Sequence, residues 1–149
     1  MHNQKDLEMK RDLKIKLTFT ELSPEGDEVT ELVTDASFES GDTCRLSYRE
    51  TAENGMGDCT VRIIWRADAP RVIRVVRCGE SESTMTFDPD RAATSEYRVS
   101  GLCFDLCMRT LESRNSFDGS AEGNIYVDYR VEVGGDVVGH RRMSVCVIV

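Results

Sequence analysis

The stretch Ile125-Tyr126-Val127-Asp128-Tyr129-Arg130-Val131-Glu132-Val133 decides the fold class of this chain. Its odd-numbered positions are all apolar or aromatic, and its even-numbered positions are mostly charged. Side chains of a β-strand alternate between the two faces of a sheet, so this pattern predicts a strand with one face on a core and one face in water.

The same two-residue period occurs at both ends of the chain. Leu13, Ile15, Leu17 and Phe19 alternate with polar residues, and the pattern returns from Met143 to Val149. The remaining strand-like runs are Val29–Glu39, Thr43–Thr51, Cys59–Arg66, Arg71–Cys78, Ser83–Phe87, Thr94–Val99 and Leu102–Leu111. The sequence therefore predicts about ten strands.

Short turns connect these runs, among them Asn54-Gly55-Met56-Gly57, Asp88-Pro89-Asp90 and Gly134-Gly135-Asp136. Parallel pairing needs crossovers of about a dozen residues or more, so consecutive strands are expected to pair antiparallel as a meander. Closure into a barrel removes both exposed sheet edges and is favoured over a sandwich. We predict an all-β, up-and-down barrel of about eight to ten strands over residues 13–149, as a single domain after a flexible N-terminal segment at 1–12.

Composition is consistent with one globular domain, because the 149 residues are 40% hydrophobic and 31% charged. Residues 1–12 are rich in charge and contain no apolar run of the signal-peptide kind. No stretch approaches the roughly 18 apolar residues that span a bilayer. We expect a soluble, cytoplasmic protein without a membrane partner, whose six cysteines are reduced thiols.

The net charge of -8 is concentrated in one part of the chain. Eight acidic residues and no basic residue lie between Leu17 and Cys44. Three of the acids share one strand face, opposite the parity of the apolar side chains: Glu31, Asp35 and Glu39. This acidic strand is expected to be a solvated outer wall, and it is the first place to look for a basic protein partner.

Metal, catalytic and nucleic-acid functions are disfavoured. Cys103 and Cys107 lie about 13 Å apart along a strand, too far to share a zinc ion, and no metal or other cofactor is expected. Neither His2 nor His140 is placed as a general base, so an enzyme is the least favoured of three functions. The negative net charge and the absence of a basic run argue against nucleic-acid binding.

Two charged residues share the parity of core positions. Glu50 follows Leu46 and Tyr48 on one strand face, and Arg77 shares its face with Ile73 and Val75. If those aliphatic residues face inward, Arg77 does too, and it then needs a partner because an unpaired buried charge is costly. Glu50 or Tyr48 at the same barrel mouth would serve.

Such a cluster can hold the polar head of a small molecule whose apolar part packs inside the barrel. The candidate ligand-binding residues, including Met56 from the loop near the mouth, are Tyr48, Glu50, Met56, Trp65, Arg77, Met85, Phe87, Tyr97 and Tyr129. The alternative is a filled barrel with a structural ion pair, in a structural or protein-interaction module. A monomer and a homodimer are both compatible with the sequence.

Four short strings occur in a characteristic order: Leu46-Ser47-Tyr48-Arg49-Glu50, Asn54-Gly55-Met56, Arg77-Cys78-Gly79 and Met85-Thr86-Phe87. In these strings, and from about Lys14 to the C-terminus, the chain resembles the YwiB-like bacterial proteins, the family called domain of unknown function 1934. The resemblance implies a calycin-like (lipocalin-like) closed β-barrel in a cytoplasmic bacterial protein with no established biochemical activity. The chain departs from the family at Ser100-Gly101-Leu102, where the family usually has a Pro-Tyr-Gly turn.

Overall fold

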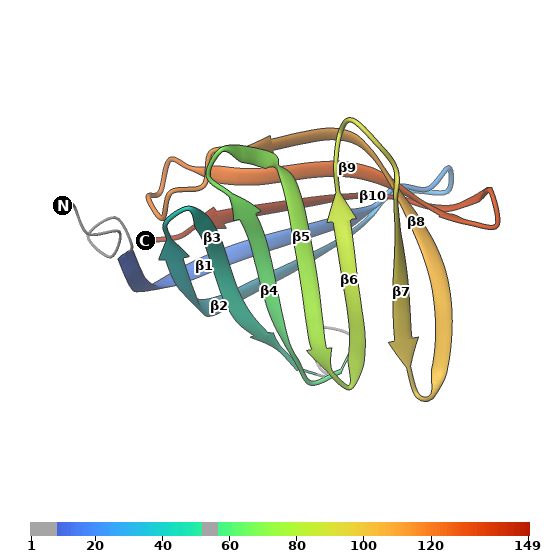
Figure 1. Ribbon diagram of the computed structural model, residues 1–149, viewed down its shortest axis with the longest axis horizontal. Helices are drawn as coiled ribbons and strands as arrows, with labels where there is room; N and C mark the ends of the chain where they lie inside the picture. Colours follow the sequence, from blue (N-terminus) through green and yellow to red (C-terminus); the bar gives the residue numbers. More distant parts are fainter. Residues whose placement is uncertain (1–8, 52–56) are drawn as a thin grey trace.

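The computed structural model describes residues 9–51 and 57–149, which form ten β-strands (Figure 1). The strands are β1 (Met9–Glu21), β2 (Glu28–Ser40), β3 (Thr43–Glu50), β4 (Cys59–Arg66), β5 (Ala69–Gly79), β6 (Ser81–Phe87), β7 (Ala93–Val99), β8 (Leu102–Asn115), β9 (Asn124–Val133) and β10 (Asp136–Val147). No helix occurs in the described ranges, so none of these residues belongs to a helix that would cross a membrane.

Each strand pairs antiparallel with the next one along the chain, and β10 returns to pair with β1. This last pairing runs from Ile15 opposite Val147 to Glu21 opposite Arg141, and it closes the sheet into a barrel. The prediction of an all-β, up-and-down barrel is therefore confirmed.

Alternation of side chains places the core inside the ring, as β9 illustrates. Ile125, Val127, Tyr129 and Val131 are buried, whereas the residues between them face outward or are only half-buried. Buried side chains from the other strands join the same interior cluster.

Aromatic side chains fill one end of the barrel. Phe38 of β2 stacks on Trp65 of β4 at a ring-centroid distance of 6.0 Å, and Phe117, which follows β8, packs edge-on against both. All three side chains are buried. This end is therefore closed by packing and has no room for a guest.

The opposite end is wider because the neighbouring strands β2 and β3 separate there. β2 pairs with β3 only from Ser37 to Glu39, so the first part of β2 diverges from the last part of β3. The result is a barrel mouth between the β1–β2 hairpin and the strands β3 to β6.

The start of the barrel differs from the prediction. β1 begins at Met9, and Met9–Asp12 pair with Ser37–Ser40, so the part of the expected flexible segment from residue 9 onward is strand. These residues lack the apolar alternation that marks a half-buried strand. Backbone pairing with β2 holds them on the outside of the barrel, so they need no apolar face. Residues 1–8 lie outside the described part of the chain.

Truncating Phe38 tests the aromatic end. Phe38→Ala should lower the free energy of unfolding by about 3–5 kcal/mol, because a buried aromatic ring is replaced by a cavity. Val33→Ala on the same strand is the control, since Val33 is 53% exposed and its truncation should cost below about 1 kcal/mol. Urea unfolding of both variants measures the difference, and equal losses would contradict this account of the packing.

Candidate functional site

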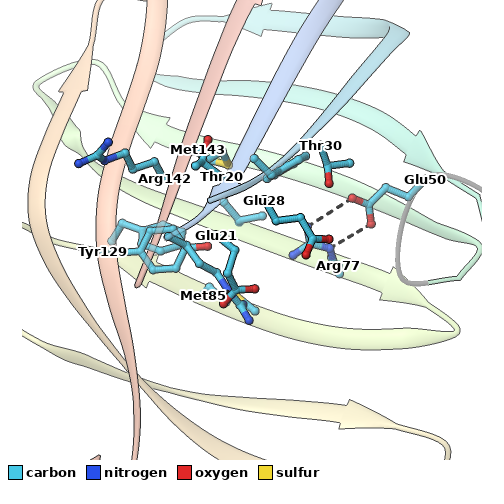
Figure 2. A pocket seen from close by; sticks show the side chains of 14 residues that line it. Thr20, Glu21, Glu28, Thr30, Glu50, Arg77, Met85, Tyr129, Arg142 and Met143 are labelled. Carbon is cyan, nitrogen blue, oxygen red and sulfur yellow. Dashed lines mark hydrogen bonds and ion pairs between the residues drawn. The ribbon is translucent and has the colours of Figure 1, made fainter. Parts of the chain in front are cut away.

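A cavity of about 320 Å³ opens at the barrel mouth (Figure 2). Its apolar wall consists of Phe19, Val75, Met85, Phe87 and Met143. Its polar wall consists of Thr20, Glu21, Glu28, Thr30, Glu50, Arg77, Tyr129, Arg141 and Arg142. One cavity therefore presents both an apolar surface and charged groups.

An ion pair between Glu50 and Arg77 forms part of this wall. Arg77 donates from Nε to Oε1 of Glu50 over 3.1 Å and from Nη2 to Oε2 over 3.4 Å. The two side chains are only 4% (Glu50) and 11% (Arg77) exposed. Such a buried, two-pronged pair fixes both groups in position.

Strand register brings the two residues together. Glu50 ends β3 opposite Cys59, and Arg77 lies on β5 opposite Val61, so β4 runs between them. Ile73 and Val75 face inward, and Arg77 follows them as the parity of β5 requires. The ion pair thus bridges two strands across the inner face of a third.

The electrostatics keep Arg77 charged. Burial disfavours the guanidinium, but the hydrogen bond and charge of Glu50 outweigh burial and raise the pKa of Arg77. Cys59 donates its thiol hydrogen to Oε1 of Glu50 over 3.4 Å. Burial, together with Glu50, raises the pKa of Cys59, so it is a protonated thiol rather than a nucleophile.

Arg77 has donor capacity that Glu50 does not use. A guanidinium carries five N–H groups, and Glu50 accepts from Nε and Nη2. Among the described residues, Glu50 is the only hydrogen-bond partner of the Arg77 side chain, and Arg77 lines the cavity. The Nη1 edge of the guanidinium is therefore available to an acceptor.

Two tyrosines lie beside the pair. Tyr129 lines the cavity, and its ring packs against Phe87 at a centroid distance of 4.5 Å. Burial raises the pKa of Tyr129 although Arg141 and Arg77 oppose the shift, so the side chain is a neutral phenol. Tyr48 is buried, and its hydroxyl has no hydrogen-bond partner among the described residues.

The charges of the rim are largely balanced. Arg141 donates from Nε to Oε2 of Glu21 over 3.3 Å, and Arg142 lies 3.4 Å from a carboxylate oxygen of Asp128. Glu50 and Arg77 form a further ion pair, so most charged groups around the mouth have a partner of opposite charge. The cavity is therefore polar at its rim without a strong excess of one sign.

The structure gathers only part of the predicted site. Glu50, Arg77, Met85, Phe87 and Tyr129 line one cavity together. Tyr48 and Tyr97 are both buried, and neither lines the cavity.

A further predicted residue, Trp65, is not in the cavity wall. Trp65 lies in the aromatic end of the barrel, because it is four residues, or about 13 Å, along β4 from Val61, the residue level with Arg77. The prediction placed Trp65 inside the barrel, where it lies, but beside the wrong end. Met56 lies outside the described residues.

Sequence reasoning missed the wall contributed by β1, β2 and β10, which includes Phe19, Thr30, Arg141 and Met143. A usable signal existed for Arg141, because it shares the odd-numbered parity of buried Met143 on β10. That is the same parity argument that located Arg77.

The acidic strand on β2 is paired with bases on its neighbours. Glu31 lies 2.9 Å from Nζ of Lys16, and Asp35 lies 4.0 Å from Nζ of Lys14, both on β1. Glu39 lies 3.8 Å from Nη1 of Arg45 on β3. These pairs neutralise much of the acidic face in the folded protein.

A ten-stranded meander barrel with a mouth cavity defines the structural class of this chain. The chain belongs to the family of the domain of unknown function (DUF1934), whose model matches residues 14–145. The chain is also similar to the crystal structure of the ywiB protein from Bacillus subtilis, with a TM-score of 0.78 and 17% sequence identity over 97% of this chain and 96% of that one. At this identity the likeness concerns the fold alone. No curated protein matches the sequence.

Breaking the buried ion pair should be costly. Arg77→Met leaves the Glu50 carboxylate buried without a cation and should lower the free energy of unfolding by about 3–5 kcal/mol. Adding Glu50→Gln to this variant should restore part of the loss, because no unpaired charge then remains. Arg66→Met is the control, since it breaks an exposed pair with Asp68 and should cost at most about 1 kcal/mol. Equal small losses in urea unfolding at both sites would contradict a buried pair.

Stability should fall at alkaline pH, partly through Tyr48. Burial raises the pKa of Tyr48 above its usual value, so the unfolded chain releases the phenol proton at a lower pH than the folded one. The stability linked to this group is complete below about pH 10 and is lost as the pH rises further. Tyr48→Phe should make the free energy of unfolding fall less steeply with pH, whereas Tyr126→Phe on the outer face of β9 should not. Urea unfolding over a series of alkaline pH values measures both slopes, and identical slopes would contradict the assignment.

Proposed function

We propose that this barrel binds a small, partly apolar molecule in its mouth cavity. The apolar part of the ligand packs against Phe87, Met85 and Met143, and its polar head accepts hydrogen bonds from Arg77. The observation that carries the proposal is the position of Arg77: its side chain is only 11% exposed, yet its guanidinium has donors at the wall of a cavity that no described residue uses. An acceptor on a molecule in the cavity would satisfy these donors.

The dimensions of the cavity limit the ligand. A volume of about 320 Å³ lies at the lower end of the range of about 300–1,000 Å³ that is typical of small-molecule sites. A metabolite-sized compound fits this space, and a long lipid chain does not. The aromatic end of the barrel offers no extension, because Phe38, Trp65 and Phe117 fill it.

The charges favour a ligand without a net negative charge. Glu50 already neutralises Arg77, Glu21 accepts from Arg141, and Glu28 adds a further carboxylate to the wall. A full anion at Arg77 would meet these acids, whereas a carbonyl or amide oxygen would accept the same hydrogen bond without repulsion. A neutral or zwitterionic molecule is therefore expected.

Unpartnered hydroxyls near the cavity support the proposal. Ser83 lies opposite Arg77, and Thr110 lies opposite Tyr129. Their hydroxyl oxygens are buried, and neither has a hydrogen-bond partner among the described residues. Water or ligand groups that reach this layer would gain hydrogen bonds that the chain does not supply.

Native mass spectrometry of freshly purified protein tests the proposal, because it detects any ligand that stays bound during purification. Wild-type protein should carry a non-covalent adduct, and Val75→Phe should lose it because the larger side chain fills the cavity. Val76→Phe is the matched control, since Val76 follows on the same strand and faces outward. The thermal midpoint of each variant shows whether it is folded.

Titration with defined probes tests the expected chemistry when no adduct is retained. Benzamide, which joins an apolar ring to a neutral amide, should shift NMR resonances of residues in the cavity wall, and benzoate should do so more weakly. Val75→Phe should abolish the benzamide shifts, and Val76→Phe should leave them. The absence of both an adduct and any benzamide response would overturn the proposal in favour of a filled structural barrel.

A further inference from the structure

One stretch of the barrel has a free backbone edge. β8 pairs with β9 only from Cys107, which lies opposite Glu132, to Asn115. Residues 102–106 of β8 extend beyond β9 and pair with β7 alone. In Figure 1 the β7–β8 hairpin points downward and the β9–β10 hairpin points to the right, so the two hairpins diverge.

Apolar side chains line this free edge. Leu102, Phe104 and Leu106 have the parity of the buried residue Met108, which faces the barrel interior. Beyond the end of β9 nothing covers them fully: Leu102 is 59% exposed, Phe104 is 47% exposed and Leu106 is half-buried. An uncovered edge strand with apolar side chains is a template for pairing with another strand.

The turn at the tip of the hairpin fixes which backbone groups are free. Ser100 and Gly101 have φ values of 51° and 78°, as in a two-residue type I′ turn. Val99 and Leu102, which flank such a turn, exchange both of their hydrogen bonds, and the pattern then alternates along the hairpin. Cys103 and Asp105 therefore direct their N–H and C=O groups away from β7, toward the free side.

We propose that two copies of this chain pair antiparallel through this edge, about a two-fold axis at Phe104. In this register, Cys103 of one copy lies opposite Asp105 of the other, and each such pair exchanges two backbone hydrogen bonds. The outward groups of both residues are satisfied in both copies. The interface is isologous and closes as a dimer rather than growing into a fibre.

Side-chain complementarity supports a second copy as the occupant. Phe104 faces Phe104 of the partner copy in the closely spaced, non-hydrogen-bonded position, and Leu102 faces Leu106. All of these contacts are apolar. The same segment therefore supplies both halves of a matching surface.

The neighbouring registers are less favourable. An axis at Asp105 would place the two Asp105 carboxylates directly opposite each other, and like charges in that position are destabilising. An axis at Cys103 would bring the turn residue Gly101 opposite Asp105 and shorten the paired segment. The register at Phe104 avoids both costs.

Sedimentation analysis over a series of protein concentrations tests the dimer. The wild-type chain should approach twice the monomer mass, and Phe104→Glu should raise the dissociation constant of the dimer by more than about tenfold. Val33→Glu is the control, because Val33 is an exposed valine on β2, remote from the edge, and its substitution should leave the dimer unchanged. A wild-type chain that remains monomeric at every concentration would overturn the proposal.

Cysteine cross-linking tests the register in a Cys103→Ser background. Phe104→Cys should form an intermolecular disulfide on mild oxidation, because cross-strand Cα atoms at a non-hydrogen-bonded position lie within disulfide range. Leu102→Cys alone should not form this disulfide, since residue 102 of one copy and residue 102 of the other lie on opposite sides of the axis. Adding Leu106→Cys should restore cross-linking, because residue 102 of one copy lies opposite residue 106 of the other. Cross-linking of Leu102→Cys alone, or failure of Phe104→Cys in a chain that dimerises, would overturn the register.

The interface is independent of the proposed ligand site. No residue of the 102–106 segment lines the cavity. Phe104→Glu should therefore leave the benzamide response unchanged, and Val75→Phe should leave the dimer unchanged. The two proposals fail or succeed by separate measurements.

Discussion

The pairing of β1 with β10 is the constraint on which the rest of this structure depends. It joins the two ends of a meander of neighbouring antiparallel strands into a ring. Once the ring is closed, side chains of inward parity on the strands that form it share one interior. Apolar residues satisfy this requirement by packing, and polar residues of the same parity satisfy it only by finding partners there.

The interior divides into two halves as a result. Phe38, Trp65 and Phe117 close one end by aromatic packing, whereas Glu50 and Arg77 occupy the mouth end, where β2 separates from β3. A buried ion pair is seldom the most stabilising solution, because the cost of desolvation offsets the attraction between the charges. Its position in a cavity wall, with guanidinium donors that Glu50 does not use, is the basis of the binding that we propose.

Much of this arrangement could be predicted from the sequence, and the remainder had physical reasons to be missed. Two-residue periodicity and short turns predicted the closed meander. Parity predicted an inward Arg77 only on the condition that Ile73 and Val75 face inward, and it left Glu50 and Tyr48 as alternative partners. Parity gives the face of a strand but not the height along the barrel, which depends on register, so Trp65 was grouped with residues at the other end. The strand start at Met9 was missed because its pairing with β2 relies on backbone hydrogen bonds rather than on a buried apolar face.

The central claim is that the barrel mouth is an accessible cavity in which Arg77 has donors for a guest molecule. A high-resolution crystal structure of the protein soaked with benzamide tests this claim most directly. The account predicts density for the ring between Phe87 and Met143, with the amide oxygen within hydrogen-bond distance of the Arg77 guanidinium. A mouth filled by the chain's own side chains, with no density beside Arg77, would contradict it.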